Sequence, residues 1–479
     1  MSAQVIPMIR KEFDEDAARD WLNPFLSFIS DRMEAMDKET PTATLHGITS
    51  TFLANKSEIL GQLILALLKK RFADLFVQEH TNCPQCGKML TRRGFHKRGI
   101  VTLSGSFELE RPYFYCVACA YGFYPLDEAL ELSQSSFQHD VQELGAWFAA
   151  ELPFDLAEEA LQRSTTISMS DASLHDSVKR IAADLEVADV CPSRAEIIKK
   201  IEKFSEGKRW RPVVMGSMDG AYAPVRPEPS PYRGKRGKGD WDDVKGLRFY
   251  LVDKDRIEHL ISWHQIGTSQ ELSAALSAIK EAGLIPEDKV RLCFVADGAP
   301  WIWKCVQEVF PNAKQALDYF HCSEHLHQLA AAQYGKGTPK AQEWVEASVV
   351  RLFHKQATHV IAGIRRMKPA SPEAKKLITQ TANYLKKHAK RVSYGTLRHG
   401  GYHIGSGAME SANKLISHVR LKRSGAWWYP SNANNMLKLR CAKYNGTFDR
   451  VMERHREKEQ ERRRARRQRP QAEPSQDKT

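Results

Sequence analysis

An alternation of strand-like and helix-like segments after Trp210 constrains the fold of this chain more than any other feature of its sequence. Apolar patterns predict strands over 213–218, 246–253 and 256–266, the last two joined by a tight polar turn. A helix pattern then covers 269–283 and ends on a glycine, a common helix stop. Three strands before the first helix predict an antiparallel start to a mixed sheet.

The rest of this pattern adds two strand–helix units. A mostly apolar run at 290–296 suits a buried strand, a helix pattern follows at 301–310, and another strand is expected at 316–320. The predicted order is therefore βββαβαβα. Three antiparallel strands followed by βα units form the ribonuclease H arrangement, so we expect a ribonuclease H-like α/β domain.

Two aspartates stand at matching places in this pattern. Asp219 directly follows the strand expected at 213–218, Asp297 directly follows the strand expected at 290–296, and each precedes a glycine that would let a substrate backbone approach. Carboxylates that end neighbouring strands can hold two divalent metals about 3.5–4 Å apart, and Mg²⁺ prefers such oxygen ligands. The alternative is an ordinary Asp-Gly turn at each place. The matched pair favours a metal site.

A third acid, Glu410, lies in the first turn of a helix that follows the glycine-rich text at 405–407. An acid at this place complements the helix dipole and needs no further role. The functional alternative makes Glu410 a third metal ligand beside the two aspartates.

Two Cys-x-x-Cys pairs interrupt the helical text of the N-terminal half. Each pair can supply two thiolates of a tetrahedral site from one turn, and the 29 residues between the pairs leave room for a β-hairpin. We therefore expect one structural Zn²⁺ in a zinc ribbon, bound by Cys83, Cys86, Cys116 and Cys119. Unrelated free thiols and a redox pair are the alternatives. The other cysteines, expected to be buried thiols, are Cys191, Cys293, Cys305, Cys322 and Cys441.

The charge balance favours a polyanionic partner. Lys and Arg number 71 against 58 Asp and Glu, a formal net charge of +13, and the segment 450–469 alone holds ten Lys or Arg against four Glu. Clustered positive charge most often serves nucleic-acid binding. The most apolar run, 59–68, is shorter than the roughly 18–20 residues that span a bilayer, and no signal-like apolar core is visible at the start. We expect a cytoplasmic, nucleoid-associated protein that makes no membrane contact.

Several short motifs resemble those of a known enzyme family. They are MDG at 218–220, ADGAPWIW at 296–303, DYFHCSEHL at 318–326, HIGSGAMES at 403–411, RLKRSGAWW at 420–428 and ANNMLKLR at 433–440. The first four are similar to the catalytic segments of the ISKra family of bacterial insertion-sequence transposases, within the Mutator-like group of DDE transposases. The last two resemble the block after that family's catalytic Glu. The resemblance covers roughly residues 80–450.

The resemblance implies Asp219, Asp297 and Glu410 as a DDE triad that holds two Mg²⁺ or Mn²⁺ ions per active site. It places the family's C/D-x2-H element on Asp318 and His321, where His321 would orient a carboxylate or contact the scissile phosphate. A packed structural histidine is the alternative. The implied reaction is DNA strand cleavage and strand transfer. The implied partners are double-stranded transposon ends and target DNA, bound by a homodimer or a higher oligomer.

The expected architecture is multidomain: a helical N-terminal region with a zinc ribbon, then the ribonuclease H-like catalytic domain, split by a helical insertion. The resemblance implies this split from the 113 positions between Asp297 and Glu410. The expected segments are a helical N-terminal region (1–80), the zinc ribbon (81–125), a helical region with a possible helix-turn-helix for DNA binding (126–205), the first part of the catalytic core (206–325), the helical insertion (326–398), the last part of the core with the Glu (399–449) and a basic disordered tail (450–479).

Basic and aromatic residues near the predicted site are candidates for DNA contact. A glycine-loosened loop between the first two strands suits phosphate contact. Its basic residues are Arg233, Lys235, Arg236 and Lys238. In a second group, after the predicted catalytic helix, rings would stack on an unpaired base or, alternatively, pack the helix. This group is Arg420, Lys422, Arg423, Trp427 and Trp428. A polar loop that we exclude from the site holds Asp240, Asp242 and Asp243.

The sequence leaves two other functions open. One is a domesticated, non-catalytic DNA-binding protein, against which the presence of all three acids counts. The other is a ribonuclease H-like nuclease without strand transfer, against which the ribbon, the split fold and the text at 420–428 count.

Overall fold

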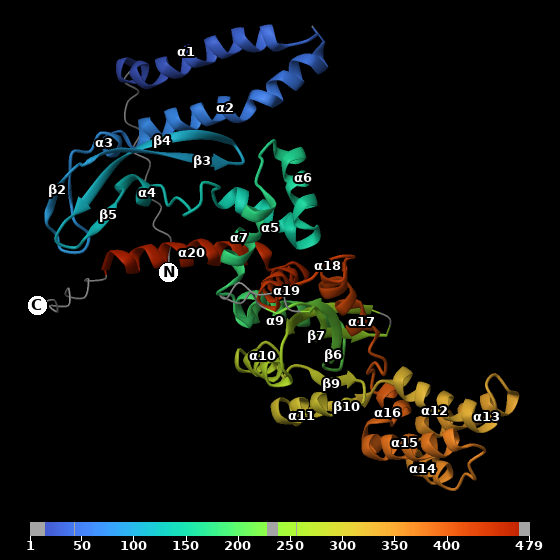
Figure 1. Ribbon diagram of the computed structural model, residues 1–479. Coiled ribbons are helices and arrows are strands. Elements are labelled where there is room, and N and C mark those ends of the chain that lie inside the picture. The colour runs from blue at the N-terminus through green and yellow to red at the C-terminus, as the bar shows by residue number, and fades with distance from the viewer. Residues whose placement is uncertain (1–14, 43, 228–237, 255, 469–479) are drawn as a thin grey trace, which may run out of the picture. The chain divides into compact units, whose positions relative to one another are not determined.

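The computed structural model describes residues 15–42, 44–227, 238–254 and 256–468 (Figure 1). Contacts between Cα atoms divide the chain into two compact units. Unit 1 comprises Met1–Ser177 together with Met452–Thr479, and unit 2 comprises Val178–Val451.

Unit 1 begins with helices α1 (Glu15–Glu39), α2 (Leu45–Arg71) and α3 (Ala73–Phe76). Helices α2 and α3 contact strand β4 (Gly105–Cys116) of a small sheet, and α1 packs on α2. Helix α2 lies along strand β4, where Ile64 and Leu68 pack on a buried cluster that includes Leu109 (Figure 1). By length and composition alone, α2 is also long and apolar enough to cross a membrane, and 17% of its apolar window is buried. Ile48, Phe52 and Leu53 on this helix are exposed.

Two antiparallel sheets in unit 1 carry the cysteine pairs. The two-stranded sheet is β1 (His80–Asn82) with β2 (Met89–Thr91), and the three-stranded sheet, in the order β3-β4-β5, is β3 (Gly94–Thr102), β4 (Gly105–Cys116) and β5 (Tyr121–Phe123). Strands β3 and β4 pair along their whole length, from Gly94 beside Tyr113 to Thr102 beside Gly105. The β-hairpin predicted between the cysteine pairs is therefore present.

Short helices follow the sheet: α4 (Pro125–Ala129), α5 (His139–Glu151), α6 (Phe154–Thr165) and α7 (Asp171–Ala182). Helix α6 ends at Thr166, whose left-handed φ of 67° turns the chain toward α7. Two helices joined by such a turn are the geometry expected of a helix-turn-helix. A DNA-reading role for this pair stays a prediction.

The basic C-terminal segment, which we predicted to be a disordered or lone-helix tail, forms a helix that packs along one face. Residues Phe448–Gln468 form helix α20, and Met452, His455 and Glu459 on it are buried. These side chains recur at three- and four-residue spacing, so they share one face of α20. The high charge of this segment predicted exposure, so its buried face was missed. Residues 469–479 lie outside the described part of the chain.

Unit 2 is built on a five-stranded mixed sheet in the order β10-β9-β6-β7-β8. Its strands are β6 (Val213–Val225), β7 (Asp240–Asp253), β8 (Arg256–Ile266), β9 (Arg291–Ala296) and β10 (Lys314–Leu317). β6, β7 and β8 pair antiparallel, whereas β9 runs parallel to both β6 and β10. The predicted succession of three antiparallel strands and two strand–helix units is present.

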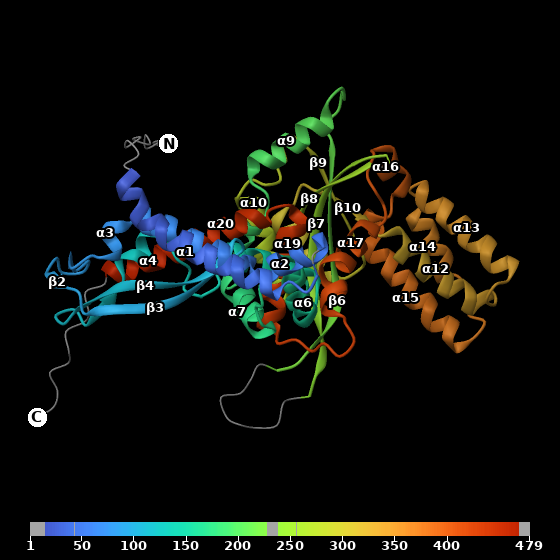
Figure 2. The same ribbon diagram turned by 90° about the horizontal axis from the view of Figure 1, so that it is seen from above.

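Strand bounds in unit 2 differ from the predicted ones in two places. β6 continues to Val225 and β7 begins at Asp240, so the two form a long ribbon that extends past the rest of the sheet (Figure 2). Asp240, Asp242 and Asp243 therefore lie on a strand and not in a polar loop. β10 ends at Leu317, because the next residue caps a helix.

Helices cover both faces of this sheet, with α19 on one side and α10 on the other (Figure 1). The helices that flank it are α8 (Val187–Val190), α9 (Arg194–Ser205), α10 (Ser269–Glu281), α11 (Pro300–Val309), α17 (Gly407–Ala412), the π-helical η2 (Asn413–His418), α18 (Val419–Leu421) and α19 (Pro430–Asn445). Phe249, Phe294 and Phe310 form an aromatic cluster in the core, with ring centroids 5.6–6.1 Å apart.

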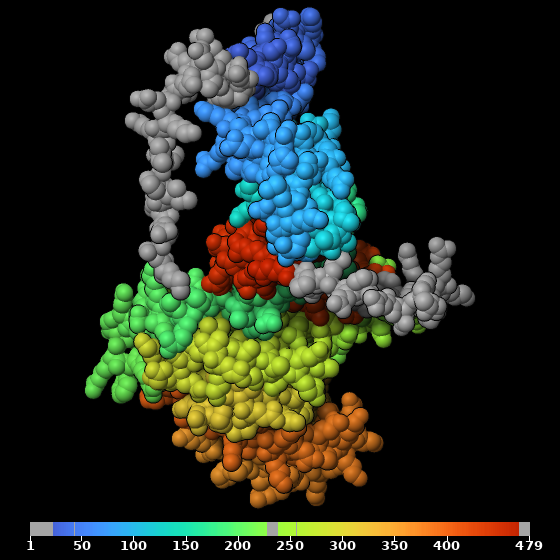
Figure 3. Space-filling view, turned by 90° about the vertical axis from the view of Figure 1, so that its left-hand side faces the viewer, coloured from blue at the N-terminus to red at the C-terminus, as the bar shows by residue number. Residues whose placement is uncertain are grey.

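A helical group follows β10 and forms one continuous mass at the end of unit 2 (Figure 3). Its members are α12 (Tyr319–Tyr334), α13 (Pro339–Phe353), α14 (Ala357–Arg365), α15 (Pro372–His388), the 3₁₀ turn η1 (Ala389–Arg391) and α16 (Tyr394–His399). Contacts between α12 and both α13 and α15, and between α14 and α15, hold the group together.

Candidate functional site

The register of two parallel strands brings Asp219 and Asp297 to equivalent positions. Ser217 of β6 lies beside Val295 of β9, and each aspartate is two residues further along its strand. Neighbouring strands are about 4.8 Å apart, so the two aspartates lie side by side at the same edge of the sheet. Asp297 follows its strand as predicted, whereas Asp219 lies within β6, which does not end at residue 218.

A hydrogen-bond relay connects Asp219 to the helix that carries Glu410. The Asn413 Nδ2 atom donates to Asp219 Oδ2 over 2.8 Å, and Asn413 Oδ1 lies 3.0 Å from Nε2 of His264, a buried residue of β8. Glu410 is exposed one turn before Asn413, at the junction of α17 with a π-helical segment, a feature frequent at functional sites. The sequence analysis missed Asn413 and His264. Nothing in the local sequence marks either residue as part of the site.

Negative charge accumulates at this edge of the sheet. The pKa of Asp219 is raised to about 6, mainly by burial and also by the charges of Asp297 and Glu410, against opposing effects of Gly220 and His321. Among the residues that the structure describes, these three acids do not form a group of ligand atoms within 4.8 Å of one another. Repulsion between carboxylates favours such spacing, and a bound divalent cation would favour their closer approach.

Asp318 positions its neighbours and is not available as a ligand. It is buried at the N-terminus of α12, where Oδ1 accepts the backbone N–H of His321 over 2.8 Å and Oδ2 accepts that of Ser406 over 2.5 Å. Its Oδ1 also lies 3.2 Å from His321 Nδ1. Burial raises the pKa of Asp318, but the hydrogen bonds from His321 and Ser406 outweigh burial, and the net shift is downward.

His321 faces the acids as a cation. Its hydrogen bond with Asp318 raises its pKa to about 9 against the opposing effect of burial, and the charges of Asp297 and Asp219 add to this shift. The imidazole is therefore protonated at neutral pH and half-exposed. The role of His321 in orienting a carboxylate or contacting phosphate stays a prediction.

The glycines after the two aspartates lie close to other side chains of unit 2. A Cβ at Gly220 would lie 2.5 Å from Oδ1 of Asp243, and a Cβ at Gly298 would lie 2.4 Å from the ring of Tyr384. The approach of a substrate backbone to these glycines stays a prediction. The space beside each is filled by the chain itself, and Tyr384 of α15 brings the helical group against the Asp297 turn.

Two of the predicted DNA contacts are buried. Arg420 is 3% exposed, and its guanidinium lies 4.8 Å from the ring centre of Trp428, which is 8% exposed. The backbone of Trp428 pairs with the end of β6, through its N–H to the carbonyl of Pro224 over 3.1 Å. Arg420 and Trp428 therefore pack the core, which was the alternative interpretation.

Other predicted DNA contacts lie on an exposed patch at the far end of the β6–β7 ribbon. We call it the basic–aromatic patch, and it consists of Tyr222, Lys238, Trp241, Lys422 and Trp427. Trp427, 43% exposed, covers Gly239, while Lys422 lies 6.0 Å from the ring centre of Trp241, 55% exposed. Arg423, the residue after Lys422, is half-buried. Sequence analysis missed Tyr222 and Trp241. Arg233, Lys235 and Arg236 lie outside the described residues.

The four cysteines of the predicted zinc site converge in unit 1. Cys83 Sγ lies 3.9 Å from Cys119 Sγ, Cys86 Sγ lies 3.7 Å from Cys116 Sγ, and all four sulfurs are within 4.8 Å of one another. Zinc–sulfur bonds of about 2.3 Å in a tetrahedron separate sulfurs by roughly 3.8 Å, so the donors fit Zn²⁺. Hydrogen bonding to Cys86 and burial raise the pKa of Cys119 to about 12.

The remaining cysteines fit the prediction of buried thiols. In the described chain all nine cysteines are free, and the five outside the four-cysteine cluster are buried.

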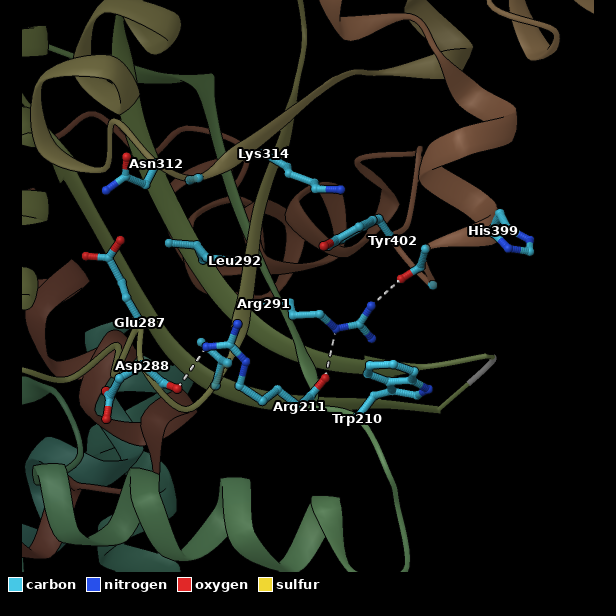
Figure 4. Close-up of a pocket in the computed structure, with 14 residues that line it drawn as sticks. Trp210, Arg211, Glu287, Asp288, Arg291, Leu292, Asn312, Lys314, His399 and Tyr402 are labelled. Atoms are coloured by element: carbon cyan, nitrogen blue, oxygen red, sulfur yellow. Dashed lines mark hydrogen bonds between the residues drawn. The ribbon is translucent and has the colours of Figure 1, made fainter.

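A hollow of about 1030 Å³ in unit 2 lies away from the acids. It opens where β9 begins at Arg291 (Figure 4), whereas Asp297 follows the opposite end of that strand. The guanidinium of Arg291 donates to the carbonyls of Arg211 and Gly400, each over 2.9 Å, and these bonds hold it to the backbone.

Comparison with known sequences gives a family match over part of the chain. The uncharacterised protein family UPF0236 matches residues 285–459, a range that contains Asp297 and Glu410. The chain is also 21% identical over 332 residues to the "UPF0236 protein in vanSb 3'region" of Streptococcus gallolyticus, covering 68% of each protein. The resemblance to the ISKra family stays a prediction.

Among solved structures, the chain is weakly similar to transposases. The Drosophila P element transposase strand transfer complex is 13% identical with a TM-score of 0.25, over 68% of this chain and 82% of that one. The Mos1 strand transfer complex is 9% identical with a TM-score of 0.15, over 53% and 77%. TM-scores this low do not establish a shared fold.

Proposed function

We propose that this chain is a DNA transposase of the insertion-sequence type, which cleaves DNA strands and transfers them by DDE chemistry. The observation that carries the proposal is the parallel register that sets Asp219 beside Asp297, with the Glu410 turn tied to Asp219 through Asn413. Three acids separated by 78 and 113 positions thus gather at one sheet edge. The proposal includes two further assignments. The unit 2 domain belongs to the ribonuclease H-like class, and the chain belongs with the ISKra family that its motifs resemble.

The donor set suits Mg²⁺ or Mn²⁺. Asp219, Asp297 and Glu410 offer oxygen atoms only, which hard divalent cations prefer. The pKa of Asp219 is raised mainly by burial, with smaller contributions from the charges of Asp297 and Glu410. Two such ions, when bound, activate a water or a 3′-hydroxyl and stabilise the leaving oxygen of an in-line displacement.

The residues of this chain would then position the reacting groups. Asn413, fixed by buried His264, holds one carboxylate oxygen of Asp219 and leaves the other toward Gly220. The His321 imidazolium, held by Asp318, supplies a positive charge for the scissile phosphate beside the acids. Positioning and charge neutralisation are what phosphoryl transfer asks of a protein.

The basic–aromatic patch is proposed to bind DNA at the end of the β6–β7 ribbon. Lys238 and Lys422 would neutralise phosphates, while Trp241 and Trp427 offer exposed rings on which an unpaired base can stack. In unit 1, the proposed zinc ribbon at Cys83, Cys86, Cys116 and Cys119 would add a structural role without taking part in the reaction.

The test uses the full chain with duplexes from the DNA that flanks its gene. We expect Mg²⁺-dependent cleavage at an inverted-repeat end and joining of the 3′-hydroxyl end to target DNA. Asp219→Asn and Asp297→Asn should lose both steps and keep end binding, while Asp242→Asn, an exposed acid on β7, should keep all three. Cleavage without joining would indicate a nuclease, and binding without cleavage would indicate a non-catalytic protein; either result overturns the proposal.

A further inference from the structure

We propose that His139, His455 and Glu459 form a second metal site in unit 1, for a divalent transition metal such as Zn²⁺. The three residues come from two helices that are distant in the sequence. His139 is the first residue of α5, and the other two stand one turn apart on α20. One ligand atom from each lies within 4.8 Å of the others.

The separation of the donor atoms fits a metal better than a direct hydrogen bond. His139 Nε2 lies 3.5 Å from Glu459 Oε2, beyond the 2.7–3.2 Å usual for N–H···O bonds. Metal–nitrogen and metal–oxygen bonds of about 2.0–2.2 Å in a tetrahedron separate donors by roughly 3.3–3.6 Å. The rings of His139 and His455 meet edge-on with centroids 6.1 Å apart, so both imidazoles border the same space.

The chemistry of the donor atoms determines which metals fit this site. Two imidazoles and one carboxylate suit Zn²⁺, Co²⁺ or Ni²⁺, whereas Mg²⁺ and Ca²⁺ prefer oxygen ligands alone. Residues four apart on a helix present their side chains on one face, which is how His455 and Glu459 share the site. Three protein ligands leave a fourth position for water.

The donor atoms lie in an enclosed part of unit 1. His455 is 4% exposed and Glu459 is 5% exposed. A metal ion here would join α5 to α20 across 316 positions of sequence and fix the C-terminal helix within unit 1. This role is independent of the acids in unit 2 and of the four cysteines.

Metal content of the full chain, purified with zinc present, tests the site. We expect two zinc ions per chain in the wild type and one in His455→Gln/Glu459→Gln. The double variant Cys83→Ser/Cys86→Ser should also retain one. The matched control is Glu453→Gln, an exposed acid on the same helix, which should keep two. One zinc per wild-type chain, lost only with the cysteines, would overturn the proposal.

A cobalt titration of the metal-free wild type keeps the test decisive if the double variant fails to fold. The four-thiolate site gives intense sulfur-to-metal charge-transfer absorption. We expect a second equivalent of Co²⁺ to add weaker visible bands without further charge transfer, as nitrogen and oxygen ligands do. If the spectrum stops changing after one equivalent, His139, His455 and Glu459 do not bind metal.

Discussion

The buried charge of Asp219 predicts that Asp219→Asn stabilises the metal-free protein at neutral pH. Burial, with the charges of Asp297 and Glu410, raises the pKa of Asp219 from 3.8 to about 6. Each pH unit between the folded and unfolded pKa is worth about 1.4 kcal/mol, so ionised Asp219 destabilises the fold by up to about 3 kcal/mol. An asparagine keeps the size of the side chain and can still accept the hydrogen bond from Asn413.

The sign of the pH dependence follows from the raised pKa. Below pH 4 the carboxyl is protonated in the folded and unfolded chains, and Asp219 has no electrostatic effect on stability. Between pH 4 and 6 the unfolded chain ionises first, so wild-type stability falls. Above pH 6 Asp219 is ionised in the folded and unfolded chains, and the whole destabilisation of about 3 kcal/mol is present. The advantage of Asp219→Asn should therefore be largest at pH 7.5 and should shrink as the pH approaches 4.

Urea unfolding without added divalent metal measures this effect. Eight of the ten tryptophans fall between positions 210 and 428, so their fluorescence reports on unit 2. Asp242→Asn is the matched control and should change the free energy of unfolding little, because Asp242 is exposed. Added Mg²⁺ should stabilise the wild type and not Asp219→Asn. A variant less stable than wild type at pH 7.5, or an advantage that does not vary with pH, would refute the reasoning.

Three further predictions concern the other sites. Cys83→Ser with Cys86→Ser should lower the zinc content by one ion per chain and the melting temperature of unit 1, since structural zinc contributes folding energy; unchanged metal content would contradict this. Trp427→Ala should weaken single-stranded DNA binding by about 1–3 kcal/mol in a fluorescence titration, and an unchanged affinity would exclude base stacking there. Arg464→Ala with Arg466→Ala, both exposed on α20, should reduce the slope of log affinity against log salt by roughly 2 without altering sequence preference; lost preference would mean that these residues read bases.

The sequence predicted the parts of this fold that local pattern controls. Strand periodicity located the five strands of unit 2, and it placed Asp219 and Asp297 at corresponding points of β6 and β9. The cysteine spacing predicted the cluster that includes Cys83 and Cys119 and the hairpin between the pairs. In each case the decisive information lies within a few residues along the chain.

Contacts between distant residues could not be predicted in this way. Asn413 bonds Asp219 across 194 positions and His264 across 149, and neither partner has a local signature. Arg420 looked like a surface cation because charge suggests exposure, yet it packs against Trp428. The same bias concealed the buried face of α20. Burial of charged side chains depends on tertiary partners, which composition does not report.

The most direct test of the proposed mechanism is the strand-transfer rate of Glu410→Gln on pre-cleaved transposon ends with Mg²⁺. Losing one ligand removes several kcal/mol of charge stabilisation, and about 1.4 kcal/mol corresponds to a tenfold change in rate. We predict a loss of at least about 10³-fold with end binding unchanged. A Glu410→Gln protein that joins ends at a rate near that of the wild type would contradict the assignment of Asp219, Asp297 and Glu410 as one catalytic site.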